Sequence, residues 1–147
     1  MKALVQRVRY ARVSVNGECV GAIDAGMLVL LGVERDDGPE LLEKMAERLL
    51  NYRLFADSEG RMNASLRDTG GGLLLISQFT LAADTRKGLR PGFSTAAAPA
   101  DAQLLYNALL DLLAKKHMPV AGGRFGADMQ VELLNDGPVT FMLEVSP

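Results

Sequence analysis

Two short polar segments carry the residue types in this chain that could do chemistry. The first, Ser77-Gln78-Phe79-Thr80, offers two hydroxyls, an amide and an aromatic ring directly after the apolar run 73–76. Such a set could orient an ester and its alcohol, while backbone N–H groups at the strand end stabilise an oxyanion. The second segment, 135–140, contains Gly137 and Pro138, whose rigid backbone carbonyls could test the shape of a small substrate.

Each segment also has a purely structural interpretation. Ser77 and Thr80 could satisfy buried backbone groups while Gln78 faces water, because buried hydroxyls usually serve that purpose. The residue types in 135–138 predict a hairpin turn between two strand-like runs, 129–134 and 139–145. Thr80 as a nucleophile has no base near it in the sequence, since the single histidine, His117, falls at the end of a predicted helix.

The composition is that of a soluble globular protein. The chain has 147 residues, of which 48% are hydrophobic and 23% charged, ordinary values for one domain spanning 1–147. Met1 and Lys2 lead straight into an alternating strand pattern, without the apolar segment of a signal peptide. The longest apolar runs, 27–31 and 73–76, are far too short to cross a bilayer. We therefore expect a cytoplasmic protein with no membrane partner.

The scarcity of cysteine and histidine limits the kinds of catalytic site. Cys19, the one cysteine, cannot form an intramolecular disulfide, and His117 alone cannot help to build a zinc site. A Cys–His nucleophile would require Cys19, just after the Asn16-Gly17 turn, to meet a histidine at a helix end. No carboxylate cluster has calcium-loop or two-metal spacing. We expect neither a metal nor a cofactor.

Basic residues gather locally although the net charge is −2. A net charge of this sign gives no global attraction to nucleic acid. Each local group could be ordinary solvated surface, whereas two groups that converge could grip the backbone of an RNA end. The groups are Arg7, Arg9 and Arg12; Arg86, Lys87 and Arg90; and Lys115 with Lys116.

The hydrophobic pattern predicts strands at both ends of the chain and two helices between them. Alternation over 3–15, the Asn16-Gly17 turn and the return over 18–23 predict a hairpin. The run 27–33 is apolar on both faces and predicts a central strand. Helical spacing predicts helices at about 39–52 and 101–117, whereas 70–72 and 85–100 are expected to be loops. We expect an α+β fold with a curved, mostly antiparallel, barrel-like sheet and two main helices.

The two polar segments, in this order and at this separation, resemble those of the D-aminoacyl-tRNA deacylases. The similarity rests on Ser77-Gln78-Phe79-Thr80-Leu81, on the run 122–129 and on 135–140, and it extends to 4–8 and 88–94. It covers essentially the whole chain. The resemblance implies a cytoplasmic homodimer that hydrolyses the ester linking a D-amino acid to the terminal ribose at the 3′ end of aminoacyl-tRNA, without metal or cofactor.

The resemblance also implies roles for individual residues. Gly137-Pro138 would form a cis peptide, inserted into the pocket of the partner subunit, that holds the substrate α-ammonium and collides with the Cβ of an L-residue. Glycine, which lacks a Cβ, would pass, so glycyl-tRNA would be a side substrate. The remaining site residues are Thr80 and Gln78 in catalysis, Ser77 and Phe79 at the ester end, Arg7 bracing the Gly-Pro loop, Met129 beside the terminal adenosine, and Asn135 in substrate binding.

Two mechanisms and one other function stay open at this point. Either Thr80 is the nucleophile or the ribose 2′-hydroxyl of the substrate activates water, and the lack of a base near Thr80 favours the second. A Thr80 esterase would also act on esters that lack the 2′-hydroxyl. A non-catalytic module that binds RNA ends would need a basic stripe with exposed stacking aromatics, yet aromatic residues are only 5% of this chain.

Overall fold

A long first strand organises the sheet. The computed structural model describes residues 1–147, and β1 runs over Lys2–Val15. Asn16 and Gly17 have φ of 51° and 79°, the left-handed pair that a tight hairpin needs, and they lead into β2 (Glu18–Ile23). One edge of β1 is shared between two antiparallel partners, β2 and β3 (Gly26–Gly32). The predicted hairpin and the buried central strand are both confirmed.

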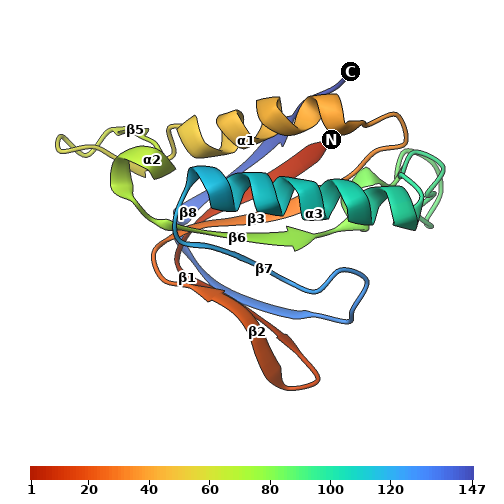
Figure 1. Ribbon diagram of the computed structural model, residues 1–147, viewed down its shortest axis with the longest axis horizontal. Helices are drawn as coiled ribbons and strands as arrows, with labels where there is room; N and C mark the ends of the chain where they lie inside the picture. The colour runs from red at the N-terminus through yellow and green to blue at the C-terminus, as the bar shows by residue number, and fades with distance from the viewer.

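The sheet curls until its two ends nearly meet (Figure 1). Its order is β2-β1-β3-β6-β7, with β8 on the other edge of β1. All three pairings of β1, with β2, β3 and β8, are antiparallel. In contrast, β6 (Gly72–Ser77) runs parallel to β3, and β7 (Val120–Gly122) runs parallel to β6. A Cβ built on Gly21 of β2 would lie 2.3 Å from the carbonyl oxygen of Gly122 in β7. The expected α+β fold with a barrel-like sheet is confirmed, and the sheet is mixed because β6 and β7 join it in parallel.

Two main helices cover one face of this sheet. The first begins as the short 3₁₀ helix η1 (Pro39–Leu41) and continues as α1 (Leu42–Asn51); the second is α3 (Pro99–Lys116). Figure 1 shows α1 and α3 side by side over the sheet. Their apolar faces pack on the strands in a core cluster of 24 buried residues, and burial of this kind is the main stabilising contribution to the fold. Both helices start with proline near the first position, where its missing N–H costs nothing.

Smaller elements fill the connection from α1 to β6. A two-stranded ribbon of β4 (Phe55–Ala56) and β5 (Met62–Ala64) is followed by α2 (Leu66–Thr69). The expected loop at 70–72 is present only at Gly70 and Gly71, as a tight connection between α2 and β6. Gly70 ends α2 in the left-handed conformation, and Gly72 is already in β6, where a Cβ would lie 2.9 Å from Ile23 side-chain atoms. After β6 the chain forms the 3₁₀ helix η2 (Phe79–Ala82).

The hairpin predicted at 135–138 is wrong, because β8 (Gln130–Glu144) continues through it without reversing. Both halves of β8 pair antiparallel with β1: Asn135 lies opposite Val8 and Thr140 opposite Gln6. Between these two pairs, four residues of β8 lie opposite the single residue Arg7 of β1, and the excess is extruded. We call residues 136–139 the Gly-Pro bulge. Residues that favour turns also suit bulges, and only the shared partner strand decides which of the two forms.

Candidate functional site

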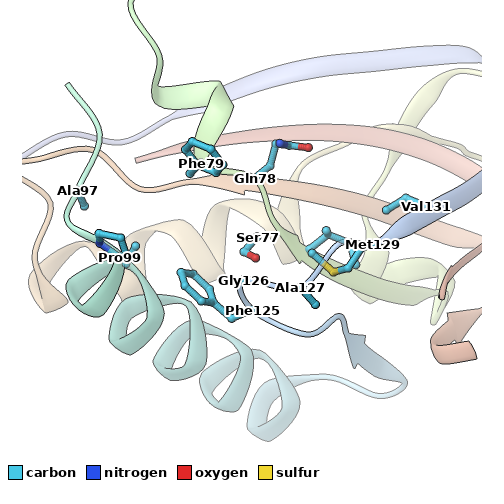
Figure 2. A pocket seen from close by; sticks show the side chains of 12 residues that line it. Ser77, Gln78, Phe79, Ala97, Pro99, Phe125, Gly126, Ala127, Met129 and Val131 are labelled. Atoms are coloured by element: carbon cyan, nitrogen blue, oxygen red, sulfur yellow. The ribbon is translucent and has the colours of Figure 1, made fainter. Parts of the chain in front are cut away.

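One cavity of about 420 Å³ opens at the carboxyl end of β6 (Figure 2). Its wall comes from four parts of the chain: the end of β6 with η2, the loop before α3, the first turn of α3, and the segment that leads into β8. Most of the lining is apolar. The twelve lining residues are Ile76, Ser77, Gln78, Phe79, Ala97, Pro99, Ala102, Phe125, Gly126, Ala127, Met129 and Val131.

The polar side of the cavity is the predicted segment 77–80. The Gln78 backbone N–H donates to the Leu31 carbonyl at 2.7 Å, which ends β6 beside β3. The Gln78 side-chain amide donates to the Thr80 hydroxyl at 2.6 Å. Because the first N–H groups of a helix have no partner inside it, η2 begins with free donors at Phe79 and Thr80. The segment therefore offers hydroxyl, amide and backbone donors at the cavity, and backbone donors of this kind can stabilise a negative charge that develops on a bound carbonyl oxygen.

Tyr106 of α3 holds two sides of the cavity together from beneath. Its buried hydroxyl donates to the Leu75 carbonyl of β6 at 2.7 Å and accepts from the Gly123 backbone N–H at 3.1 Å. Burial raises the pKa of the Tyr106 hydroxyl, so it remains the neutral donor that this arrangement needs. Its ring lies 6.0 Å from that of Phe125, centroid to centroid. The end of β6 and the loop before β8 are thereby fixed relative to each other.

Met129 forms the opposite wall and packs closely on the backbone. A Cβ built on Gly123 would lie 2.8 Å from the Met129 sulfur and 3.0 Å from Ile76. The Met129 sulfur also accepts a hydrogen bond from the Arg124 backbone N–H at 3.4 Å. A side chain at 123 would therefore displace the end of the methionine from its place beside Ser77 (Figure 2).

The Gly-Pro bulge lies elsewhere in the molecule and is braced from β1. Arg7 donates from Nε to the Asp136 carbonyl at 2.8 Å and from Nη1 to the Leu54 carbonyl at 3.0 Å. The Gly137–Pro138 peptide is cis, and both residues are exposed. Gly137 has φ of 147°, and a Cβ there would lie 2.7 Å from the Val139 side chain and 3.2 Å from Arg7 Nη2.

The Asn135 side chain is hydrogen-bonded across the base of the bulge. Its side-chain oxygen accepts from the Val139 backbone N–H at 2.7 Å, and its amide nitrogen donates to the Thr140 hydroxyl at 3.0 Å. These bonds close the chain across the extruded residues. Asn135 lies at the base of the bulge, away from the cavity.

Within one protomer the cavity and the bulge do not meet. Val131 is the last residue of β8 that lines the cavity, and it pairs with Val13, whereas the bulge follows Asn135, which pairs with Val8. Five residues of β1 separate these levels, roughly 16 Å at the rise of a β-strand. The structure thus brings Ser77, Gln78, Phe79 and Met129 together with Thr80 beside them, and leaves Arg7, Asn135, Gly137 and Pro138 apart.

Several cavity residues escaped the sequence analysis. Phe125 stands between the glycines of 122–126, and an aromatic in a glycine-rich segment is a signal that could have been read. Pro99 and Ala102 carried no such signal, because their place depends on how α3 docks. His117 lies at the other end of β6, where its Nε2 is hydrogen-bonded to the Gly71 carbonyl at 2.6 Å.

Two further structural findings concern the ionisable groups and the helices. No group of three or more His, Cys, Asp or Glu side chains is arranged to hold a metal ion. No helix is both long and apolar enough to cross a membrane.

Comparison with known proteins finds similarity along the whole chain. A family model described as D-Tyr-tRNA(Tyr) deacylase matches residues 4–144. The D-aminoacyl-tRNA deacylase of Stutzerimonas stutzeri (strain A1501) is 64% identical over 144 residues, 98% of this chain and 99% of that protein. A solved structure named c-Myc DNA Unwinding Element Binding Protein has a TM-score of 0.95 at 43% identity, with both chains covered in full. A probable eukaryotic D-amino acid tRNA deacylase shares the fold, with a TM-score of 0.83 at 17% identity over 98% of each chain.

Proposed function

The chain belongs to the D-aminoacyl-tRNA deacylase family, an ester hydrolase family, and from this premise we propose how its residues divide the work. The family assignment removes the non-catalytic binding module from consideration. The observation that carries the proposal is the cavity at the end of β6, where Ser77, Gln78 and Phe79 face Met129. We place the aminoacyl ester against the first three residues and the terminal adenosine beside Met129, and we place the reaction in the cytoplasm.

In the proposed reaction, the backbone N–H groups at the start of η2 bind the ester carbonyl. Water attacks the carbonyl carbon, the negative charge develops on the carbonyl oxygen, and these donors stabilise it. The bond to the ribose oxygen then breaks, and that oxygen takes a proton. The products are a free D-amino acid and tRNA.

The ribose 2′-hydroxyl of the substrate, rather than Thr80, activates the water in this proposal. Thr80 Oγ accepts a short hydrogen bond from Gln78, and a nucleophilic hydroxyl would need a base to remove its proton. The single histidine is bonded to Gly71, just before β6, six residues and roughly 20 Å of extended chain from Ser77. Substrate esters lacking the 2′-hydroxyl would be hydrolysed normally if Thr80 were the nucleophile and poorly if it is not.

In this proposal the Gly-Pro bulge of a second copy of the chain selects D-residues and rejects L-residues. Gly137 and Pro138 are exposed and cannot reach the cavity of their own protomer, so a homodimer in which each bulge enters the partner's cavity accounts for both facts. Backbone carbonyls of the bulge would hold the substrate α-ammonium. The Cβ of an L-residue would then collide with the backbone, a D side chain would point to solvent, and glycyl-tRNA would be accepted.

The outer face of the β1–β8 pair is suited to such an association. Tyr10, Leu134 and Met142 are each 39–48% exposed there, and β8 carries the bulge itself. Burial of these apolar side chains between two copies would favour the dimer.

The first experiment is single-turnover deacylation of D-Tyr-tRNA and L-Tyr-tRNA by the wild type and by Gly137→Ala. We expect fast hydrolysis of the D-ester and negligible hydrolysis of the L-ester by the wild type. In Gly137→Ala the added Cβ would collide with the Val139 side chain and crowd Arg7. This variant should therefore lose activity or the discrimination between D- and L-esters. Hydrolysis of neither ester by a folded dimer would overturn the proposal.

A further inference from the structure

A compact loop projects beside the cavity, and we call it the finger, residues 84–92 (Figure 1, between β6 and α3). Its base is closed by two backbone hydrogen bonds, from Asp84 N–H to the Gly92 carbonyl at 2.7 Å and from Gly92 N–H to the Asp84 carbonyl at 2.9 Å. Arg86 pairs with the Asp84 carboxylate at two points, 2.9 and 2.7 Å. These bonds fix the conformation of the finger, which follows η2 closely in the chain.

The tip of the finger is basic and entirely in solvent. Lys87 and Arg90 are exposed, and neither forms an ion pair. Leu89 between them is fully exposed. The finger carries three cations against one carboxylate in a chain whose net charge is −2. Its positive charge is therefore local, and Lys87 and Arg90 are free to pair with an external anion.

An aromatic pair connects the finger to the cavity. Phe79 lines the cavity and is 59% exposed, and Phe93 follows the last residue of the finger and is 44% exposed. Their ring centroids are 5.2 Å apart, with the planes tilted by 46°. Two adjacent aromatic rings left this open to water offer faces on which a planar group could stack.

We infer that the finger and the Phe79–Phe93 pair bind the single-stranded 3′ end of the tRNA where it leaves the cavity. A base before the terminal adenosine stacks on Phe93, and Lys87 and Arg90 contact phosphates. Aromatic stacking and phosphate pairing are the two interactions that proteins combine to hold single strands without reading their sequence. The inference rests on the proposed function, which places the terminal adenosine in the cavity.

The test compares two substrates, D-Tyr-tRNA and the D-tyrosyl ester of adenosine, which has the reacting groups but no phosphates or further bases. The variants are Lys87→Ala/Arg90→Ala and Phe93→Ala. The matched control is Lys44→Ala/Arg53→Ala, which removes the same charge from exposed positions on α1 and just after it. The readouts are kcat and KM for both substrates and the salt dependence of kcat/KM.

We expect both Lys87→Ala/Arg90→Ala and Phe93→Ala to lower the ratio of kcat/KM for the tRNA to kcat/KM for the adenosine ester, mainly by raising KM for the tRNA. Loss of one stacked base corresponds to a fall of about 5- to 150-fold. Loss of two phosphate contacts should make the slope of log kcat/KM against log salt shallower by about 1.4. The control pair should leave the ratio and the slope as they are in the wild type.

The outcomes separate the inference from the function on which it rests. Equal losses on both substrates, or an unchanged ratio in both variants, would overturn the inference and leave the deacylase function standing. Hydrolysis of neither substrate by the wild type would instead remove the proposed function. Phe93→Leu serves where Phe93→Ala fails to fold, because it keeps the apolar volume and removes the aromatic face.

Discussion

Arg7 donates from Nε to the Asp136 carbonyl oxygen, 2.8 Å away, and so attaches the Gly-Pro bulge of β8 to the neighbouring strand β1. The same guanidinium also donates to the Leu54 carbonyl at 3.0 Å. Planar, forked donors of this kind hold two acceptors at once, which a lysine ammonium cannot reproduce in the same geometry. The Arg7 side chain is only 18% exposed. The exposed backbone that we propose selects the substrate is thus held in place by a mostly buried side chain.

Arg7→Lys should therefore lower the activity on the D-ester without unfolding the protein. Hydrogen bonds to charged groups contribute about 1.5–3 kcal/mol, so we expect deacylation of D-Tyr-tRNA to fall roughly 10- to 150-fold. The measurement is the single-turnover rate on the D- and L-esters. Arg9→Lys is the matched control, because Arg9 is 71% exposed and reaches only the Asp136 carboxylate, at 3.5 Å. Similar effects of the two substitutions would contradict the bracing role.

Thr80→Ala should retain most of the activity. In the proposed mechanism Thr80 supplies its backbone N–H and a hydrogen-bond partner for Gln78, and alanine keeps the N–H. Removal of a true nucleophile lowers kcat by orders of magnitude, about 10⁶-fold in a serine protease, whereas we expect a loss within about tenfold, the usual size for one hydrogen bond. Single-turnover kinetics, with a search for a trapped acyl-enzyme, decides between the two mechanisms.

Tyr106→Phe should destabilise the fold and loosen the cavity. The substitution removes the hydroxyl that donates to the Leu75 carbonyl and accepts from the Gly123 N–H, and it leaves only the direct 3.2 Å bond from this N–H to the carbonyl. Loss of one intramolecular hydrogen bond costs about 0.5–1.5 kcal/mol. The free energy of unfolding, from urea denaturation, measures the effect. Tyr10→Phe on the exposed face of β1 is the control, and an equal change in both variants would show that the Tyr106 hydroxyl does not matter.

Glu47 should make stability depend on pH in the acid range. Hydrogen bonds from Arg67 and Lys116 lower the pKa of the Glu47 carboxyl from 4.5 to about 2. Because the folded-state pKa is the lower one, this stabilisation is complete above the unfolded pKa and is lost as the pH falls from 4.5 towards 2. Glu47→Gln should flatten the curve of unfolding free energy against pH in that window. Parallel curves for the variant and the wild type would refute the assignment.

The positions of the main elements could be predicted from the sequence because their causes are local. Alternation predicted β1 and β2, Asn16-Gly17 supplied the hairpin backbone, and helical spacing over 39–52 and 101–117 located both helices, the second of which begins two residues earlier, at Pro99. The place of Ser77 at the end of a buried strand followed from the same reasoning, since an apolar run that stops at polar residues marks a strand end. The polar half of the cavity was therefore visible in the sequence.

The remainder was decided by which segments meet in three dimensions. The residue types of 135–138 suit a turn as well as a bulge, and only the pairing of both flanking runs with β1 makes β8 one strand. Phe125, Pro99 and Ala102 reach the cavity because Tyr106 and the docking of α3 bring distant segments to the end of β6. The sequence determined the chemistry of the two polar segments. The tertiary structure alone placed them apart in one protomer, because strand pairing and helix packing depend on residues far away in the chain.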